Sequence, residues 1–446
     1  MLGSVACGAP GVGRDGMKLE LPAGDLLGLL RALPAESGRP SLLAGRGEGG
    51  FRDTLAWNPC ALLEGDGAQP AQTAERLEQF IAEQLGRGRL CIGYCSYELG
   101  QLLHGVPVRR KPGARLPDFC WAAYDSWLER DAERWLVRAA DQRFLEQLTW
   151  ARERAREREG WIERGGAERV RFEPTWSRAE YAAAFQRVAE YIRAGDIYQV
   201  NLTHLLRGRS SLPPRALFPH VARHNPVEHL AYLERAGHAI HSASPERFVR
   251  IRGRAIETFP IKGTRPRGGD AEQDRAQLEQ LLASAKEAAE LHMITDLLRN
   301  DLAAVCVPGS VVVRESRAAR PGPKVWHTAS HIAGELEPAL AAFAALLRLL
   351  PGGSISGCPK RRALEIIDQL EPAERGVYTG VIGRLDPDGG ADSSVAIRTL
   401  IQRGSELYLS VGGGIVYDSV QQQEWEETLL KASSFASLPA GPALER

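Results

Sequence analysis

Segments with strand-like sequence follow one another in runs along this chain, and the helical segments between the runs are long. Near the C-terminus three strand-like segments come in succession, at 377–385, 393–403 and 406–419. Apolar residues recur at helical spacing over 177–195 and 271–300. A doubly wound parallel sheet alternates strands with helices, whereas runs of strands favour antiparallel pairing. The sequence therefore predicts an α+β fold with antiparallel sheets.

Local signals define the boundaries of one helix. Ser177 and Glu180 have the spacing of a capping box, and Gly195 is placed to cap the other end. Further strands are expected at 41–45, 89–99, 311–316 and 324–336, two strands within 238–259, and further helices at 71–85, 339–350, 361–371 and 422–435.

Composition divides the chain into five parts. These are a loose Gly-rich leader at 1–16, an N-terminal region at 17–150, a charged connector at 151–174, the main domain at 175–437 and a tail at 438–446. Arginines and glutamates interleave within the connector, which is typical of a solvated helix or a mobile segment rather than a basic arm for nucleic acid.

Charge and cysteine content exclude several classes of protein. Lysine plus arginine and aspartate plus glutamate both number 56 in 446 residues, so the formal net charge is zero. This balance gives no reason to expect nucleic acid or an anionic membrane as a partner, and no apolar run reaches membrane-spanning length. The seven cysteines are odd in number and scattered, which indicates reduced thiols in a cytosolic, cytoplasmic protein.

One lysine is enclosed by residues that restrict the backbone. Lys262 lies in the stretch ETFPIKGTRPR, where Pro260 and Pro266 limit the backbone and Gly263 permits conformations closed to other residues. Such a lysine is expected to be held in place, as a charge clamp or as a nucleophile in a dry pocket. The alternative is an exposed lysine in a turn beside two arginines.

Two helical segments carry glutamates three residues apart. Glu287 and Glu290 share one face of the helix at 271–300, and Glu424 and Glu427 share one face of the closing helix. If these faces met, four carboxylates would offer the hard oxygen ligands that Mg²⁺ prefers. Taken singly, each pair is better explained as a solvated helix face.

Two glycine loops and three ionisable side chains leave their roles open. The stretch at 411–416 could present backbone N–H groups to an anion, or mark a sheet bend that another backbone approaches. The loop at 352–360 lacks P-loop spacing, but it runs into a helix whose first amides could hold a carboxylate. Arg398, expected in a strand, needs a substrate carboxylate or a structural salt bridge. Glu246 and His327 are lone titratable groups in strand-like segments, where most such residues are satisfied structurally.

Together these pieces resemble one family, the chorismate-utilising enzymes. The matching stretches cover about residues 175–437, and the region 17–145 matches more weakly. They follow the family's order: DIYQVNLT, SASPERF, PIKGTRPRG, KEAAELHMITDLLRNDL, GSISGCPKRRALEIIDQLE, RGVYTGVIG, AIRTLI and GGGIVYDSVQQQEWEET. The resemblance implies large antiparallel sheets packed together, with helices on the outside.

Two positions separate activities within the family. Members that add water to chorismate carry a lysine base where this chain has Gln199, and a glutamine cannot activate water. Members that make anthranilate typically read PIAGT where this chain reads PIKGT, so Lys262 points to amination at C4. The resemblance therefore implies conversion of chorismate and ammonia into 4-amino-4-deoxychorismate, the precursor of 4-aminobenzoate and folate. The alternatives are an anthranilate-forming enzyme and a non-catalytic protein that binds chorismate or serves as a scaffold for a glutaminase.

The resemblance also assigns roles at matching positions. Glu246 would protonate the departing 4-hydroxyl, and Lys262 would attack C2 and be displaced when ammonia adds at C4. Mg²⁺ would be held by Glu287, Glu290, Glu424 and Glu427, in part through water. The expected substrate contacts are Tyr378, Arg398 and the amides of Gly412, Gly413 and Gly414 at the enolpyruvyl carboxylate, Ser354 and His327 beside the ring, and Gln199 and Thr264.

The ammonia is expected to come from outside the chain. None of the cysteines lies in a G-x-C-x-G nucleophile elbow, so the sequence shows no glutaminase site. Ammonia would be taken from solution or from a separate glutamine amidotransferase subunit. Tryptophan-sensing relatives carry a serine where this chain has Ala44, which weakens the case for a bound tryptophan.

Overall fold

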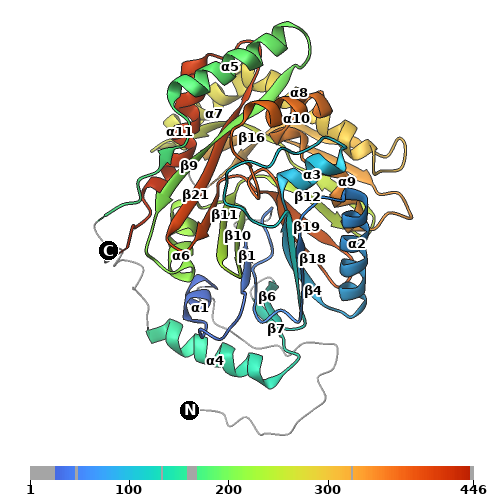
Figure 1. The fold of residues 1–446 in the computed structure, drawn as a ribbon, viewed down its shortest axis with the longest axis vertical. Helices are drawn as coiled ribbons and strands as arrows, with labels where there is room; N and C mark the ends of the chain where they lie inside the picture. Colours follow the sequence, from blue (N-terminus) through green and yellow to red (C-terminus); the bar gives the residue numbers. More distant parts are fainter. Residues whose placement is uncertain (1–25, 46–48, 132–133, 158–167, 323–324, 442–446) are drawn as a thin grey trace.

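The computed structural model describes residues 26–45, 49–131, 134–157, 168–322 and 325–441. The predicted leader lies outside the described residues, as do parts of the predicted connector and tail. The fold consists of two large antiparallel sheets packed together, with helices on their outer faces (Figure 1). This arrangement confirms the predicted α+β class.

The first sheet is built around a long central pair of strands. Its strands, in spatial order, are β17 (Gly357–Cys358), β9 (Gln199–Arg209), β21 (Glu406–Ile415), β20 (Thr399–Arg403), β11 (His238–Ser244), β10 (His229–Arg235), β1 (Ser41–Ala44), β2 (Thr54–Ala56), β6 (Trp127–Asp131) and β7 (Arg134–Arg138), with β8 (Glu173–Pro174) paired to β9.

The second sheet ends in a long hairpin. Its strands, in spatial order, are β14 (Ile261–Pro266), β16 (Val325–Glu335), β13 (Ala255–Thr258), β12 (Arg247–Arg252), β19 (Ala391–Val395), β18 (Val381–Leu385), β4 (Leu90–Cys95), β5 (Phe119–Tyr124) and β3 (Ala61–Gly65), with β15 (Val312–Pro321) paired to β16.

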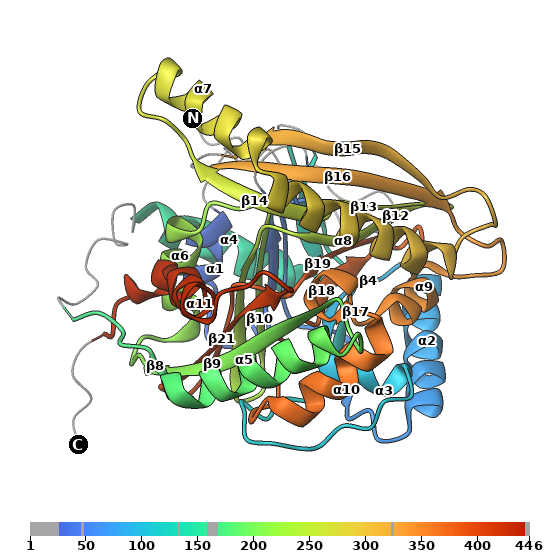
Figure 2. The same cartoon turned by 90° about the horizontal axis from the view of Figure 1, so that it is seen from above.

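Helices cover the outer faces and one end of the two sheets. They are α1 (Leu26–Ala32), α2 (Pro70–Gly86), α3 (Tyr97–Leu103), α4 (Gln142–Glu157), α5 (Arg178–Arg193), α6 (Pro214–His224), α7 (Ala271–Ala283), α8 (Ala285–Ala303), α9 (Ala342–Leu349), α10 (Lys360–Leu370) and α11 (Gln421–Ala436). Seen from above, α8 runs along β14 and β16 on one side, while α5 and α11 lie along β9 and β21 on the other (Figure 2).

Successive residues of one strand enter different layers of the core. Leu42 packs in the layer between the first sheet and its helices, while Leu43 packs between the two sheets with Ile92 and Ile382 of the second sheet. The alternation follows from strand geometry, in which neighbouring side chains point to opposite faces. Both leucines are fully buried.

The N-terminal region supplies strands to both sheets. In the first sheet β1 pairs with β10, placing Leu43 opposite Ala231, and in the second β4 pairs with β18, placing Gly93 opposite Gly383. The N-terminal region therefore shares its core with residues 175–437.

The helix predicted over 271–300 is wrong in its continuity. It is two helices, α7 and α8, because Ser284 leaves helical geometry at ψ 106° and its Oγ accepts a hydrogen bond from the backbone N–H of Glu287. At the start of α5 the predicted capping box of Ser177 and Glu180 is confirmed. The C-cap of α5 is Ala194 rather than Gly195, which follows it with φ +80°.

Two predicted strand runs contain more strands than expected. Residues 238–259 form β11, β12 and β13, with a break at 245–246 that contains Glu246. The stretch at 393–403 is divided into β19 and β20, and Arg398 lies in the break with φ +49°. The prediction that Arg398 lies in a strand is therefore wrong, and both breaks place a candidate site residue outside regular sheet.

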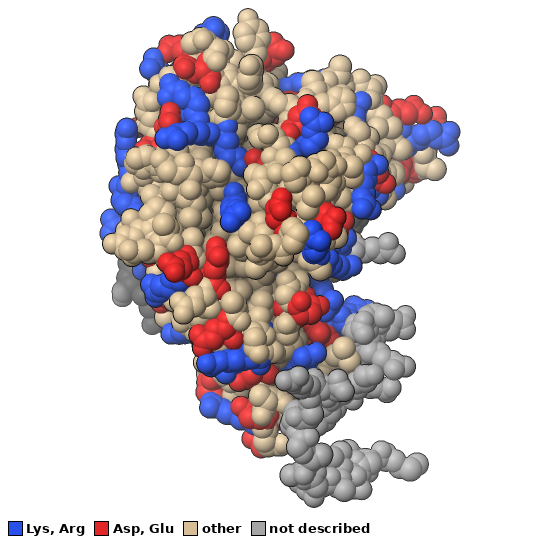
Figure 3. Space-filling model, turned by 90° about the vertical axis from the view of Figure 1, so that its right-hand side faces the viewer, with Lys and Arg blue, Asp and Glu red and all other residues tan. Residues whose placement is uncertain are grey.

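The surface carries charges of both signs. Basic and acidic side chains are interspersed over the face shown in Figure 3, as the balanced composition leads one to expect. Within the described ranges, no helix combines the length and the apolar character needed to cross a bilayer.

Candidate active site

Lys262 lies in a strand with an irregular register rather than in a turn. Lys262 faces Thr328 across the β14–β16 pair, and the register shifts between Lys262 and Thr264. Gly263 lies in this irregularity with φ +79°, a conformation that favours glycine. The hydroxyl of Thr328 donates a hydrogen bond to the carbonyl of Lys262, so β16 fixes the backbone of the half-buried lysine through its side chain as well as its backbone.

Glu246 is a buried acid beside a hydroxyl and an amine. Only 7% of Glu246 is exposed, and its Oε1 accepts a 2.6 Å hydrogen bond from the Oγ of Ser354. Burial raises the pKa of Glu246, while the Ser354 bond and the charge of Lys262 lower it in part. The structure therefore brings together three of the predicted residues, Glu246, Ser354 and Lys262, and Glu246 retains its proton to higher pH than an exposed carboxyl does.

The three glycines of β21 lie where another group approaches the backbone. A Cβ at residue 414 would come within 2.6 Å of Nε2 of Gln199, and one at residue 413 within 3.2 Å of Oε2 of Glu424. Gly412, Gly413 and Gly414 pair with β9 along one edge. Along the other edge, the pairing with β20 ends at Leu409. The N–H groups of Asn201 and Thr203 bond Ser356 and Glu371 on the far side of β9, so the amides of Gly412 and Gly414 point to the edge that β20 leaves open, while the amide of Gly413 points to β9. Both suggested roles of the stretch thus have structural support: close approach, and amides open to an anion.

Arg398 has no protein partner among the described residues. Its guanidinium makes no hydrogen bond or ion pair there, although the charge of Glu228 acts on it. Burial lowers the pKa of Arg398. The positive φ places a non-glycine residue in a conformation that needs support from its surroundings, and such residues concentrate at functional sites. The structural salt bridge considered for Arg398 is therefore not formed, which leaves a carboxylate ligand.

His327 and Thr264 are linked across the β14–β16 strand pair. Their Nδ1 and Oγ1 atoms lie 3.0 Å apart. Burial lowers the pKa of His327, and the charge of Arg398 lowers it further, so this ring lies near the arginine.

Tyr378 is 5% exposed, and burial raises the pKa of its hydroxyl.

Each of the four predicted metal ligands meets another side chain. The contacts are Glu287 with Arg265 (2.8 Å), Glu290 with Lys286 (4.0 Å), Glu424 with Ser419 (2.7 Å) and Glu427 with Lys431 (2.7 Å). The charge of Lys286, on α8, acts on both Glu424 and Glu427, on α11, so the two helices face each other within electrostatic range.

The pKa values of the two glutamates of α11 are shifted in opposite directions. Burial, with the neighbouring charge of Glu427, raises the pKa of Glu424. Burial acts in the same direction on Glu427, but the charges of Lys431, Lys262 and Lys286 together outweigh it and lower that pKa.

The carboxylates suit a divalent cation in chemistry but do not form a closed ligand set. Within the part of the chain that the structure describes, no three His, Cys, Asp or Glu side chains gather closely enough to hold a metal ion. The Oε2 atom of Glu287 is buried without a hydrogen-bond partner there, and a buried polar atom normally has one. An entering cation would supply that partner, with oxygen ligands of the kind Mg²⁺ prefers.

Sequence reasoning missed a buried ion pair behind the site. Arg375 and Glu371 bond at 2.7 and 2.8 Å, and their side chains are only 2% and 3% exposed. Their spacing of four residues is visible in the sequence, and the stretch RGVYTGVIG contains Arg375. The other partners of Arg375 adjoin predicted site residues.

A buried acid can donate a proton, and a fixed amine beside it can attack a carbon of the same molecule. An arginine whose guanidinium has no partner among the described residues adds a binding point for a carboxylate. The site therefore holds the groups that acid–base chemistry on a small carboxylate-bearing molecule would need. The sequence profile of the chorismate binding enzyme family matches residues 39–437, and the chain belongs to that family.

Two of the similar relatives carry different names. Aminodeoxychorismate synthase component 1 of Salmonella typhimurium is 37% identical over 348 residues, which span 77% of this chain and 75% of that protein. Anthranilate synthase component 1 of Cereibacter sphaeroides is 42% identical over 252 residues, spanning 56% of this chain and 50% of that protein. The crystal structure of anthranilate synthase component I from Streptococcus pneumoniae superposes with a TM-score of 0.75 at 28% identity, covering 88% of this chain and 93% of that chain. The resemblance drawn from the motifs is thereby confirmed at the level of the family.

Proposed function

We propose that this chain acts as an aminodeoxychorismate synthase component 1, which combines chorismate with ammonia to form 4-amino-4-deoxychorismate. The observation that carries the proposal is the position of Lys262. Its charge acts on both Glu246 and Glu427, and among the described residues its amine makes no ion pair. The relative from Salmonella typhimurium, which matches three quarters of its own length, carries this name.

In the proposed reaction the neutral amine of Lys262 bonds to C2 of the ring, a double bond shifts, and the C4–O bond breaks. Glu246 gives its proton to the departing hydroxyl, which leaves as water. Ammonia then bonds to C4, the double bond shifts back, and the C2–N bond to Lys262 breaks. A proton lost from the added ammonia restores Glu246, so chorismate plus ammonia gives 4-amino-4-deoxychorismate plus water.

The other candidate residues hold the substrate in this scheme. The enolpyruvyl carboxylate is bound by Arg398, Tyr378 and the open amides of β21, since a guanidinium and free N–H groups donate hydrogen bonds to a carboxylate. Ser354 keeps the carboxyl of Glu246 in one orientation through their 2.6 Å bond. His327 and Thr264, already bonded to each other, border the ring.

Mg²⁺ would be held by the glutamates of α8 and α11, in part through water. When bound, it would neutralise the ring carboxylate and the charge that develops as the C4–O bond breaks. The lysines and the arginine that now contact these carboxylates compete with it for the same oxygens. The four residues are Glu287, Glu290, Glu424 and Glu427.

The ammonia is proposed to come from a glutamine amidotransferase subunit. A glutaminase thiol needs a lowered pKa to act as a nucleophile. In this chain burial raises the pKa of Cys306 to about 11 and raises that of Cys91 and Cys95 as well. These thiols are therefore poor nucleophiles, which agrees with a separate component.

The test is to identify the product of chorismate, Mg²⁺ and ammonium salt at mildly alkaline pH by liquid chromatography and mass spectrometry. Aminodeoxychorismate with its enolpyruvyl group retained is the expected result. Anthranilate with free pyruvate would instead place the chain with the relative from Cereibacter sphaeroides and reject the assignment of Lys262. Binding of chorismate without turnover, even with a glutaminase and glutamine added, would favour a non-catalytic protein.

A further inference from the structure

A fully buried arginine ties together segments that are far apart in the sequence. The guanidinium of Arg375 donates to the carbonyl of Ile355 at 2.9 Å, to the carbonyl of Asn201 at 2.6 Å and to Oγ1 of Thr379 at 3.4 Å. Its two remaining bonds go to the carboxylate of Glu371. Arg375 thereby joins strand β9, the turn that follows α9 and the turn that leads into β18.

Each partner in this set adjoins a candidate site residue. Glu371 extends the set, because its Oε1 also accepts a 2.9 Å bond from the backbone N–H of Thr203. The neighbours are Ser354 before Ile355, Tyr378 before Thr379, Gly414 opposite Asn201 and Gly412 opposite Thr203. One ion pair therefore fixes the backbone beside the proton donor's partner and beside the proposed carboxylate site.

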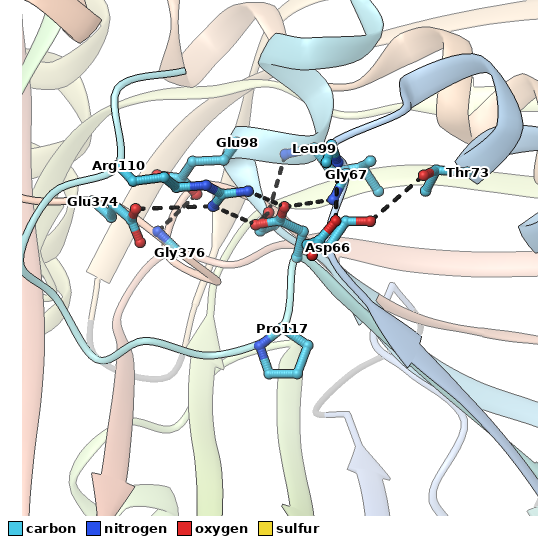
Figure 4. A network of polar contacts seen from close by, with 12 residues as sticks. Asp66, Gly67, Thr73, Glu98, Leu99, Arg110, Pro117, Glu374 and Gly376 are labelled. Carbon is cyan, nitrogen blue, oxygen red and sulfur yellow. Dashed lines mark hydrogen bonds and ion pairs between the residues drawn. The ribbon is translucent and has the colours of Figure 1, made fainter. Parts of the chain in front are cut away.

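The N-terminal region holds the same turn from behind. Both oxygens of Glu98 accept hydrogen bonds, from the backbone N–H groups of Arg375 at 2.8 Å and Gly376 at 3.0 Å. The ring of Tyr97 lies under the guanidinium, 4.4 Å from its carbon. Figure 4 shows Glu98 reaching Gly376, next to Arg110, which bonds Asp118 and approaches Glu374 at 3.8 Å.

We propose that Arg375 is a positioning residue, which sets the separation between the Ser354–Glu246 pair and the site for the substrate carboxylate. Glu98 extends this role to the N-terminal region. A buried ion pair contributes little net stability, because desolvation offsets the attraction, so its geometry is the better reason for its presence. The inference rests on the proposed function.

The test compares two buried arginines. Arg384 is as buried as Arg375, with its side chain 3% exposed, and it bonds Thr54, Glu129 and Asp386, none of which is a candidate site residue. Lysine in place of arginine keeps the charge and removes the planar fork. For Arg375→Lys we expect kcat, per folded molecule, to fall by about 10–100-fold, on the scale of a misplacement near 1 Å. For Arg384→Lys we expect kcat within about threefold of the wild type, with a comparable loss of thermal stability.

A second readout separates positioning from simple destabilisation. Activity needs protonated Glu246 and is lost as pH rises through its pKa, which the Ser354 bond lowers. Arg375→Lys should displace Ser354, and Ser354→Ala removes its hydroxyl, so both variants weaken or lose the bond that lowers the pKa of Glu246. In both, the alkaline limb of the pH–rate profile should therefore move to higher pH, by up to about one pH unit. Equal losses of kcat in the two arginine variants, or a limb that moves in Ser354→Ala alone, would overturn the inference.

Two further measurements distinguish failure of this inference from failure of the proposed function. If Arg375→Lys does not fold, Glu98→Gln replaces it, because the amide preserves shape but can accept only one of the two backbone bonds. Its expected effect is a fall in kcat of about tenfold with little change in KM, and an unchanged kcat would overturn the inference. Wild-type protein that binds chorismate but forms no aminodeoxychorismate would reject the proposed function itself.

Discussion

Two walls of the site satisfy their charges in different ways. We call them the arginine wall (Glu98, Glu371 and Arg375) and the acidic wall (Glu287, Glu290, Glu424 and Glu427). In the arginine wall the ion-paired side chains are 2% and 3% exposed. In the acidic wall the ion-paired carboxylates are 19%, 26% and 53% exposed and meet long, flexible cations.

The two walls differ in how far folding alone satisfies their polar groups. The arginine wall is complete without a ligand, since its carboxylates and guanidinium bond to each other and to backbone. The acidic wall leaves the Oε2 of Glu287 buried and without a hydrogen-bond partner among the described residues. We therefore expect changes in the arginine wall to lower stability as well as rate, and changes in the acidic wall to affect ligand binding and rate with little effect on stability.

The largest expected effect separates rate from stability beside the acidic wall. Lys262→Ala should lower the rate of amination by roughly 10²–10⁴-fold, the scale of a removed catalytic group, with little change in melting temperature. The measurement is turnover with ammonium, together with thermal unfolding. Arg187→Ala is the control, because Arg187 pairs with Glu190 on the exposed face of α5, away from both walls. A wild-type rate in Lys262→Ala would reject the covalent step.

The next effect should appear in the arginine wall as lost stability. Glu371→Gln leaves the guanidinium of Arg375 buried without a carboxylate, which costs about 3–5 kcal/mol in the free energy of unfolding. Denaturant unfolding measures this cost. A loss below about 1 kcal/mol would show that the surrounding carbonyls suffice for Arg375, and the two walls would no longer differ in stability.

Glu98 should give the arginine wall a pH dependence. Burial raises the pKa of Glu98 to about 7, from an ordinary value of 4.5. Between these values the native state holds a proton that the unfolded chain releases, so stability is highest below pH 4.5 and falls as pH rises towards 7. The fall due to this group amounts to about 3 kcal/mol. Glu98→Gln should remove it, whereas parallel stability curves for the two proteins would show that Glu98 stays ionised.

Metal dependence tests the acidic wall directly. Glu424→Gln removes one charged ligand, so the Mg²⁺ concentration for half-maximal activity should rise by at least about tenfold. Titration of Mg²⁺ after chelation measures the shift, and thermal stability should change little. An unchanged Mg²⁺ dependence would count against Glu424 as a ligand.

The two glutamate pairs of the acidic wall could be recognised in the sequence, because each is a short spacing on one helix, but only the family resemblance indicated that the two helices meet. Glu287 and Glu290 are three residues apart, and so are Glu424 and Glu427. Lys262 was identifiable for a similar reason, since its flanking prolines and glycine are local. The break of the helix at Ser284 could have been found too, because S-x-x-E marks a helix start, but the long apolar pattern concealed it.

The arginine wall could not be predicted in the same way, because its contacts depend on the closed fold. Arg375 bonds the carbonyl of Asn201, 174 residues away, and Glu98 lies 277 residues from its first donor. Backbone carbonyls carry no sequence signature, so nothing local marks Arg375 as central. Arg398 was wrongly predicted to lie in a strand for a related reason. Its apolar neighbours indicate a strand, whereas its positive φ results from tertiary packing, which the local sequence does not show.

The smallest expected effect concerns a lysine that contacts the acidic wall, and it tests most directly whether the two walls differ in their contribution to stability. Lys431 bonds Glu427 at 2.7 Å and the carbonyl of Gly412 at 2.8 Å, and the two paired side chains are 38% and 53% exposed. Exposed pairs contribute less than about 1 kcal/mol, so Lys431→Met should change the free energy of unfolding by no more than that. Lys431 also helps to lower the pKa of Glu427, which should rise in the variant. Denaturant unfolding alongside Glu371→Gln puts both walls on one scale. A loss near 3 kcal/mol for Lys431→Met would mean that the acidic wall is as fixed by folding as the arginine wall, and the division between a preformed wall and a ligand-completed wall would fail.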